Sequence, residues 1–311
     1  MKILIAYDGS ALADEAIEDL DLAGMPEGTE ALVVSAAKPW SFMIEAGGLG
    51  AVGWNPITVS DIQSFDGNSL REAEVLSHRA RNHLESKHPD WIVRAESCLD
   101  QPAAGILRKA EAWKPDLIVM GSHGRTALAR MLMGSVAHKV LHHAACAVRI
   151  NRARIRPAKR PPRLLVGVGG GAGEEHLIED LAAREWPGGT QVHLLAVLET
   201  LVMPPDAASE DLQQRLNRFA AGRHEAILGK LEGYRDRISK KGIEAFPEVT
   251  EGDPRHMLLE KAAEWDADCL FLGSRNLNGL ERILLGSVSD SIAVHAPCTV
   301  EVFRDRPAKS K

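Results

Sequence analysis

The sequence predicts an α/β fold made of two copies of one domain, each a parallel sheet with helices on both faces. The first observation is an internal repeat: residues 119–150 and 271–302, which start 152 positions apart, share twelve of 32 residues. The second is the alternation of short apolar runs with helical patterns in each half, which is typical of parallel sheets. The length of 311 residues fits two domains of about 150 residues each.

The first half opens with an apolar run at residues 3–7, which indicates a strand buried on both faces. Ser10 can cap the next helix, which we expect to end at Gly24. A loop with glycine, tryptophan and proline covers residues 38–60. Further strands are expected at residues 30–36, 92–98, 116–120 and 147–150, and further helices at residues 69–87, 103–113 and 136–143.

The second half repeats this order. Strands are expected at residues 164–168, 191–198, 245–250, 269–272 and 298–303, and helices at residues 174–184, 207–241, 254–264 and 288–294. Residues 151–163 hold six basic residues and three prolines, which favours a stiff, solvated linker over a nucleic-acid arm. We therefore divide the chain into a first domain at 1–152, a basic proline-rich linker at 153–162 and a second domain at 163–305.

The composition predicts a cytoplasmic protein without a membrane or nucleic-acid partner. A net charge of −6 argues against general nucleic-acid binding, and four cysteines without C-x-x-C spacing are typical of a reducing compartment. The apolar run after Met1 is too short for a secretory signal, and no segment approaches the roughly 20 apolar residues of a membrane span.

A candidate anion site follows the fourth strand of the first half. The segment Gly121-Ser-His-Gly124 is followed by nine residues and then by Gly134-Ser135. Glycines allow a sharp turn and a close approach of backbone N–H groups to a phosphate. Gly134-Ser135 would begin a helix, whose N–H groups and dipole favour an anion. Asp8, after the first strand, would lie across the same crevice and bind a base amino group or a ribose.

Each part of this pattern alone is weak evidence, because such glycines are usually turns and Gly-Ser is usually a helix cap. Together they resemble the nucleotide-binding subgroup of the universal stress protein (UspA-like) family, and specifically its tandem two-domain members. The family pattern Gly-x-x-Gly, nine residues, Gly-[Ser/Thr] is matched by residues 121–135, and its aspartate after strand one is matched by Asp8. The resemblance covers nearly the whole chain.

The resemblance implies two tandem Rossmann-like (adenine nucleotide alpha hydrolase-like) domains, each with a five-stranded parallel sheet of order 3-2-1-4-5. It also implies ATP, with Mg²⁺ held mainly through the phosphates. Backbone groups of Ala6, Ala36 and Met120 would line the adenine pocket. The ribose and phosphates would be lined by Gly121, Gly124, Arg125, Gly134, Ser135 and Val136.

The second half departs from this pattern. Asp8 aligns with Gly169, Gly124 with Asn276 and Arg125 with Leu277, whereas Gly273, Gly286 and Ser287 are kept. We therefore expect one ATP site, in the first half, and a degraded or altered site in the second. Gly167-x-Gly169-x-x-Ala172, with Glu199 after the next strand, is similar to a dinucleotide fingerprint. Glu199 lies too far along the chain for that pattern, so a loose glycine loop is the preferred interpretation.

Other residues leave alternatives open. His138 and His142 have metal-ligand spacing, but a packed or solvated helix face is the simpler explanation. His123 would either touch a phosphate or stand exposed in the loop. The aromatic residues of the loop at 38–60, such as Trp40 and Trp54, would form a lid or partner surface, or pack on their own domain.

No nucleophile–base pair or paired carboxylates stand out, so no catalytic residue is predicted. The first hypothesis is a nucleotide-dependent stress-response and regulatory protein. The alternatives are a slow ATPase or phosphoryl-transfer enzyme, and a nucleotide-free partner-binding protein. In the family, last strands commonly pair edge to edge. Residues 147–150 and 298–303 are apolar strands that would do so in an intramolecular pseudo-dimer or a homodimer. The protein partner is unknown.

Overall fold

The computed structural model describes residues 1–40, 58–124, 133–152, 160–169, 173–199, 210–273 and 286–304. The chain divides into two compact units. Among the described residues, unit 1 comprises 1–152 and unit 2 comprises 160–304. None of the helices in these ranges is long and apolar enough to cross a membrane.

Unit 1 is a parallel sheet with the strand order β3-β2-β1-β4-β5, which confirms the predicted order. Its elements are β1 (Lys2–Ala6), α1 (Ala11–Glu18), η1 (Asp19–Leu22), β2 (Glu30–Ala37), α3 (Val59–Lys87), β3 (Ile92–Leu99), α4 (Pro102–Trp113), β4 (Leu117–Gly121), α5 (Ser135–His143) and β5 (Ala147–Asn151). β1 lies at the centre because Ile3, Leu4 and Ile5 are fully buried between neighbouring strands and helices. Ile3 pairs with Ala31 of β2 and with Leu117 of β4.

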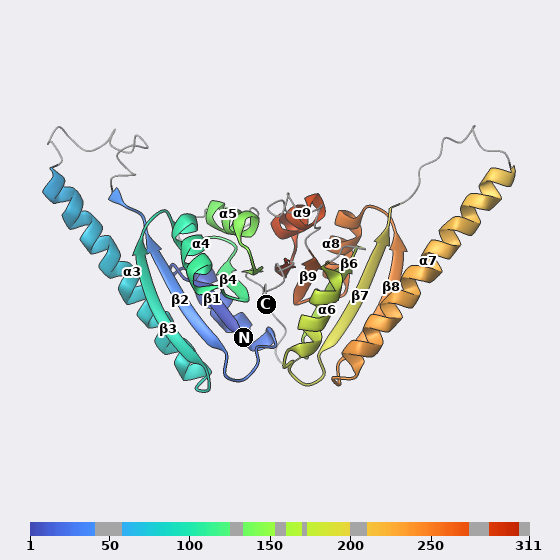
Figure 1. Cartoon of the computed structure of the whole chain (residues 1–311), viewed down its shortest axis with the longest axis horizontal. Helices are drawn as coiled ribbons and strands as arrows, with labels where there is room; N and C mark the ends of the chain where they lie inside the picture. Colours follow the sequence, from blue (N-terminus) through green and yellow to red (C-terminus); the bar gives the residue numbers. More distant parts are fainter. Residues whose placement is uncertain are drawn as a thin grey trace, which may run out of the picture. The chain divides into compact units, whose positions relative to one another are not determined.

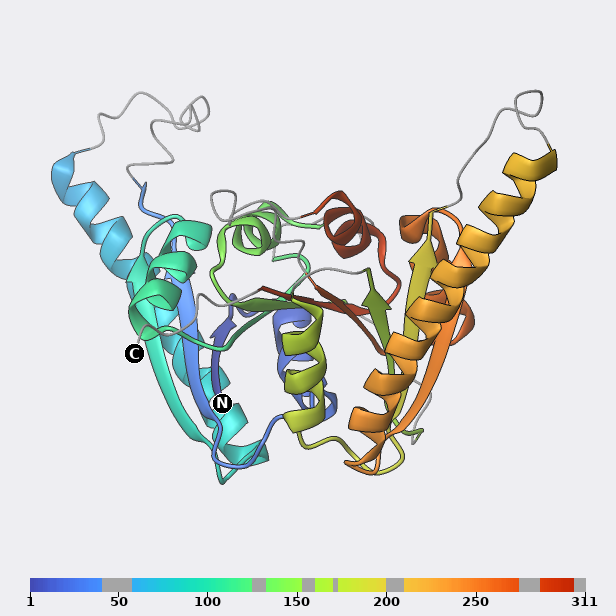
Figure 2. The same cartoon turned by 45° about the vertical axis from the view of Figure 1, so that its right-hand side comes forward.

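Unit 2 repeats the order as β8-β7-β6-β9-β10. Its elements are β6 (Arg163–Val168), α6 (Glu174–Ala183), β7 (Gln191–Leu198), α7 (Glu210–Ser239), β8 (Glu244–Glu251), α8 (Pro254–Glu264), β9 (Cys269–Gly273), α9 (Ser287–His295) and β10 (Thr299–Phe303). In each unit a long helix covers one face of the outer strands, α3 in unit 1 and α7 in unit 2 (Figures 1 and 2). α4 and α8 lie on the opposite faces of their sheets.

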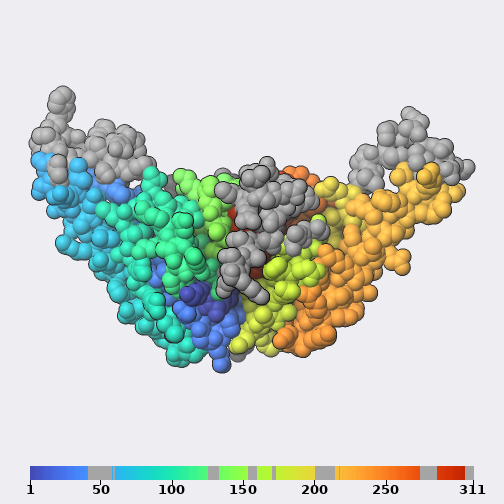
Figure 3. All heavy atoms as spheres, in the orientation of Figure 1, coloured from blue at the N-terminus to red at the C-terminus, as the bar shows by residue number. Residues whose placement is uncertain are grey.

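The long helix α3 begins ten residues before the predicted start. It begins at Val59 rather than residue 69 because Thr58 and Asp61 form a capping box. The Asp61 N–H donates to Thr58 Oγ1 at 3.2 Å, and the Thr58 N–H donates to the Asp61 carboxylate at 2.8 Å. The described part of α3 carries many exposed side chains and forms one flank of unit 1 (Figure 3).

Other boundaries differ by smaller amounts. The first helix ends at Glu18 and continues as a 3₁₀ turn to Leu22, before Gly24 adopts a left-handed φ of 64°. The long helix of unit 2 was expected at 207–241; α7 is described from Glu210 to Ser239, and residues 207–209 lie outside the described ranges.

The last strands of the two units were expected to be apolar, but each contains a buried charged residue. Arg149 of β5 is 1% exposed, and its guanidinium lies 2.7 Å from the Asp19 carboxylate. The aligned residue of β10, Glu301, is fully buried and pairs with Arg184. Both charges are therefore neutralised inside their own unit, as buried charges must be, although the two positions have opposite signs.

Candidate functional site

In unit 1 the predicted site residues meet where the strand order reverses, at the carboxyl ends of β1 and β4. Ligands of open α/β sheets bind in the crevice at this switch point. Ala6 ends β1 and pairs with Val34 of β2 and Met120 of β4. Ala36 lies two residues beyond Val34 on β2, so the three predicted adenine-lining residues lie on adjacent strands at one edge.

Asp8 and Gly124 approach each other closely across this crevice. A β-carbon built on Gly124 would lie 2.6 Å from Oδ2 of Asp8. The other carboxylate oxygen, Oδ1, accepts the N–H of Ser10 at 3.0 Å, which fixes the turn through Gly9 at φ 75°. Only glycine therefore leaves the Asp8 carboxylate where it lies, because any side chain at 124 would displace it.

Gly121 has a structural role in the same turn. A β-carbon there would lie 3.0 Å from the backbone carbonyl carbon and oxygen of Leu12, in the first turn of α1. This glycine lets α1 pack against the end of β4. The N-terminus of α1 is in turn fixed by Ser10, whose hydroxyl accepts the Ala13 N–H at 3.2 Å.

Gly134 and Ser135 form the start of α5, next to the end of β4. The Gly134 N–H donates to the Ser122 carbonyl at 2.8 Å, and a β-carbon on Gly134 would lie 3.2 Å from that oxygen. Gly134 is the N-cap and supplies no side-chain cap to the helix. Ser135 and Val136 thus lie in a first turn whose N–H groups and dipole favour an anion.

His123 is neither exposed nor a cation in this loop. Its Nδ1 lies 3.1 Å from the Ser122 hydroxyl oxygen, and its Nε2 is enclosed with no hydrogen-bond partner in the described parts of the chain. Burial lowers the pKa of His123, and the charge of Arg152 lowers it further. The imidazole is therefore neutral near pH 7 and offers no positive charge to a phosphate.

Two further expectations concern residues near the site. Arg125 lies outside the described residues, as does Trp54. Trp40 packs on its own unit: its ring stacks on Phe65 of α3 at 4.4 Å, and its backbone N–H donates to the Asp66 carboxylate at 2.6 Å. On α5, the rings of His138 and His142 lie 4.2 Å apart.

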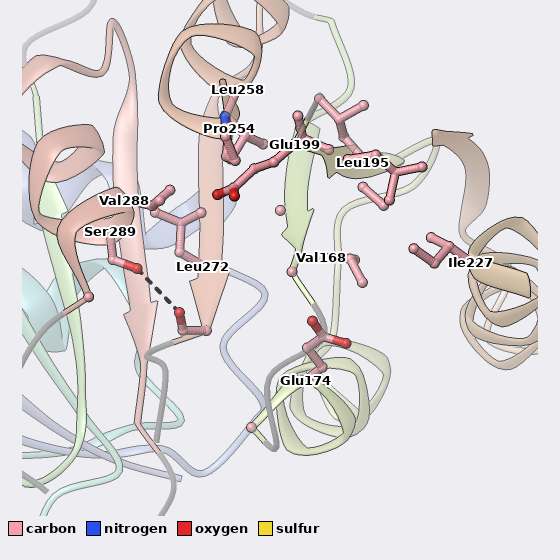
Figure 4. Close-up of a pocket in the computed structure, with 18 of the residues that line it drawn as sticks. Val168, Glu174, Leu195, Glu199, Ile227, Pro254, Leu258, Leu272, Val288 and Ser289 are labelled. Atoms are coloured by element: carbon pink, nitrogen blue, oxygen red, sulfur yellow. Dashed lines mark hydrogen bonds between the residues drawn. The ribbon is translucent and has the colours of Figure 1, made fainter. Parts of the chain in front are cut away.

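Unit 2 has a cavity of about 310 Å³ at the equivalent place (Figure 4). It lies at the carboxyl ends of β6, β7 and β9, beside α7 and the first turn of α9. Gly169 takes the place of Asp8, and a β-carbon there would meet nothing within 4 Å. The second crevice is therefore altered rather than filled.

Sequence reasoning missed two charged residues of this cavity. Glu174 aligns with Ala13 of unit 1, is 5% exposed and accepts from the Lys230 ammonium of α7 at 2.7 Å. Burial is the largest single influence and by itself lowers the pKa of Lys230, but the hydrogen bonds and charges of Glu174 and Tyr234 together outweigh it and raise the pKa. The sequence did show the change at Glu174: the repeat aligns Ala13 with Glu174, 161 residues apart, as it aligns Asp8 with Gly169.

The universal stress protein family model matches residues 1–152 and again residues 162–304. The two matches cover most of the chain. The chain belongs to the universal stress protein family. The double match and the repeated strand order make it a tandem two-domain member.

Relatives in sequence carry the same family name. A universal stress protein of Mycolicibacterium smegmatis is 29% identical over 197 residues, which cover 61% of this chain and 62% of that protein. A putative universal stress protein of Staphylococcus aureus is 40% identical over 76 residues, covering 24% of this chain and 46% of that protein. The matched part thus spans less than two thirds of these curated relatives.

Solved structures share the whole fold. A universal stress protein from Archaeoglobus fulgidus aligns over 98% of both chains, with a TM-score of 0.64 and 20% identity. A putative universal stress protein from Pseudomonas aeruginosa aligns over 98% of this chain and 93% of its own, with a TM-score of 0.56 and 14% identity. At these identities the likeness establishes the tandem universal stress protein fold alone.

Proposed function

We propose that this universal stress protein is an ATP-binding stress-response regulator, with ATP bound mainly by unit 1. The observation that supports this best is the contact between Gly124 and Asp8 above the uncapped start of α5. A β-carbon on Gly124 would displace only the end of the Asp8 side chain, so the protein core does not require glycine at this position. Glycine is required only to keep the Asp8 carboxylate in the crevice, which favours a role in ligand binding.

The residues of unit 1 fit a nucleotide with its phosphates at α5. The first-turn N–H groups of Ser135 and Val136 would donate to phosphate oxygens, and the Ser135 hydroxyl would add a donor. Glycine at 134 lets the start of α5 lie close to the Ser122 carbonyl, because a β-carbon there would lie 3.2 Å from that oxygen. Mg²⁺ would be held through the phosphates, since it prefers oxygen ligands and keeps several waters.

Asp8 would hold the nucleoside end. Its carboxylate accepts hydrogen bonds, so it would pair with ribose hydroxyls or a base amino group. Ala6, Ala36 and Met120 would offer backbone groups and small apolar surface to adenine. ATP occupancy would then set the conformation or the partner of the protein, and hydrolysis would be slow at most.

Titration calorimetry of Mg-ATP with the full chain tests this proposal. We expect one ATP per chain and a loss of about tenfold or more in affinity for Asp8→Asn, which weakens a charged hydrogen bond. Asp90→Asn is the matched control, because Asp90 is exposed and accepts from Gly28 at the amino ends of the strands.

Three outcomes would overturn the proposal. Two equivalent ATP sites per chain would contradict the preference for unit 1. Absence of ATP binding, with no nucleotide found by mass spectrometry of the purified protein, would favour a nucleotide-free partner-binding protein. Turnover above about 1 per second, in the range of kinases, would favour an enzyme.

A further inference from the structure

The strand β3 has an open edge. It stands at one end of the unit 1 strand order, opposite to the last strand β5. It pairs with β2 along its whole length, from Ile92 opposite Glu30 to Leu99 opposite Ala37, and Figure 1 shows the two strands side by side. Among the described residues, no strand pairs with its other edge. Such an edge accepts a further strand unless something in the protein prevents it.

The hydrogen bonds at the two ends of β3 show which backbone groups lie at this edge. The Ile92 N–H donates to the Thr29 carbonyl at 3.0 Å, and the Asp100 N–H donates to the Ala37 carbonyl at 2.9 Å. Because successive residues of a strand direct their N–H and C=O groups to opposite sides, the even-numbered residues of β3 bond to β2. Three odd-numbered residues therefore present these groups at the open edge: Val93, Ala95 and Ser97.

The corresponding edge of unit 2 is closed by a proline. β8 ends as β3 does, with the Gly252 N–H donating to the Leu198 carbonyl at 3.0 Å, so its odd-numbered residues also face away from the neighbouring strand. The repeat of 152 residues aligns Ala95 with Pro247, in the middle of β8. Proline has no N–H to donate and is a common means of preventing edge pairing. β3 contains neither proline nor glycine, so its edge is not blocked in this way.

The charges on β3 are complementary to those of a second β3 strand. Arg94 and Glu96 are both exposed, and the alternation of side chains places them on the same face of the strand. This face is the one toward α4, because Glu96 pairs with Lys109 of that helix. When two β3 strands are paired antiparallel with Ala95 opposite the partner's Ala95, each Arg94 lies opposite the partner's Glu96.

The same register satisfies the backbone. Hydrogen-bonded and non-hydrogen-bonded positions alternate in an antiparallel pair. Ala95 would exchange both hydrogen bonds with the partner's Ala95, and Val93 with the partner's Ser97. Arg94 and Glu96 then occupy non-hydrogen-bonded positions, where opposite side chains are closest. A slip of two residues would place Arg94 opposite the partner's Arg94, or Glu96 opposite the partner's Glu96, and like charges there are destabilising.

We propose that β3 is the interface of a homodimer, in which the open edges of two chains pair antiparallel about Ala95. A two-fold interface uses the same residues of both copies, and the arrangement of Arg94 and Glu96 about Ala95 meets that condition. The pairing also covers Ile92, which is 56% exposed and comes to lie opposite the partner's Cys98. The inference does not rest on the proposed function, because β3 contributes no residue to the proposed ATP site.

Sedimentation equilibrium of the full chain over a range of concentrations tests this inference. We expect a reversible dimer. Arg94→Glu and Glu96→Arg each place like charges opposite each other, and each should raise the dimer dissociation constant about tenfold or more. An equimolar mixture of these two variants should dimerise again, because every acidic side chain at the two positions then faces a basic one.

Two further variants separate the edge from a general effect. Ala95→Pro removes the N–H at the centre of the pairing and copies the residue that β8 has at the aligned position. This N–H makes no bond to β2, so the variant should lose the dimer and keep the circular dichroism spectrum of the wild type. Arg218→Glu is the matched control for Arg94→Glu: it makes the same charge change at an exposed position of α7 and should dimerise as the wild type does.

Four results would overturn the inference. A chain that is monomeric at every concentration has no such interface. A dimer that survives Arg94→Glu and Ala95→Pro is formed elsewhere, for example by the last strands. Equal weakening by Arg218→Glu and Arg94→Glu indicates a general charge effect. A mixture of Arg94→Glu and Glu96→Arg that stays monomeric excludes the register about Ala95. Loss of the dimer in Ala95→Pro with unchanged Mg-ATP binding supports the inference and leaves the proposed function intact.

Discussion

Gly124 approaches Asp8 so closely that a β-carbon on the glycine would lie 2.6 Å from Oδ2 of the carboxylate. The repeat changes both positions together: the second half has Gly169 in place of Asp8 and Asn276 in place of Gly124. Where the carboxylate is absent, the requirement for glycine is absent too. The paired change indicates that the two residues of unit 1 act as one feature.

Gly124→Ala is expected to weaken Mg-ATP binding about tenfold while leaving the melting temperature nearly unchanged. The atom that a methyl group would strike is the end of the Asp8 side chain, which can rotate away at little cost. The rotated carboxylate then loses its charge-assisted hydrogen bond to the ligand. Calorimetry and thermal melting of the same preparations measure both effects.

Gly169→Ala is the control for this substitution, because a β-carbon there meets nothing within 4 Å. It should leave ATP affinity as in wild type. A Gly124→Ala protein that binds ATP normally would show that Asp8 takes no part in binding.

The order of elements was predictable because the central strands are continuous apolar runs, such as β1 and β4, separated by helical patterns. The start of α3 was not. Its first turns are mostly polar, with Val59, Ile62 and Phe65 as the apolar residues, and they are followed by Gly67, a poor helix former. The capping box at Thr58 decides the start, and its effect depends on local hydrogen bonds rather than on periodicity.

The site of unit 1 was predictable to the extent that spacing specifies it: Asp8, the glycines and Ser135 converge as the motif implies. The cavity of unit 2 was not. The cost of burying the Glu174 carboxylate is offset by Lys230 of α7, which lies 56 residues further along the chain and donates a hydrogen bond to it. A single sequence does not reveal such a pairing, because the residues next to Glu174 in the sequence do not indicate which distant lysine it contacts.

Gly121→Ala should destabilise the protein by about 1–3 kcal/mol, the usual cost of overpacking. Its β-carbon would lie 3.0 Å from backbone atoms of Leu12, which cannot move without shifting α1. The matched substitution Gly273→Ala, at the end of β9, has open space and should be neutral or slightly stabilising. Urea unfolding followed by circular dichroism compares the two. Equal effects would refute the packing role of Gly121.

His123 should make the folded state less stable as the pH falls below neutrality. Burial and Arg152 lower its pKa from the ordinary 6.5, so the unfolded chain takes up a proton at higher pH than the folded chain. Stability from this residue is complete above pH 6.5 and declines as the pH falls toward the lowered folded pKa. His123→Gln should therefore flatten part of the stability profile between pH 7 and about 5, where histidines titrate.

The exposed histidine His256, with a side chain 75% exposed, gives the comparison. His256→Gln should change the pH profile less than His123→Gln does. The interpretation of a neutral, partly buried imidazole fails if the two variants have the same profile.

Asp253 should stabilise α8 through its charge, and acid should remove this contribution. Its carboxylate accepts the guanidinium of Arg255 at 2.9 Å and the backbone N–H groups of Arg255 and His256 at 2.8 and 3.3 Å. These bonds, that of the Arg255 side chain first, lower the pKa of Asp253 from 3.8 to about 2. The stabilisation is therefore complete above pH 3.8 and is lost as the pH falls toward 2.

Asp253→Ala is accordingly expected to lower the melting temperature at pH 7, and the difference from wild type should shrink as the pH falls through this range. Asp253→Asn keeps a cap acceptor without the charge. It should melt between the other two at pH 7, with a difference from Asp253→Ala that does not depend on pH. Thermal melts followed by circular dichroism measure all three proteins. If the gap between wild type and Asp253→Ala stayed constant down to pH 2, the charge of Asp253 would have no part in capping α8, and the hydrogen-bond geometry alone would account for the effect.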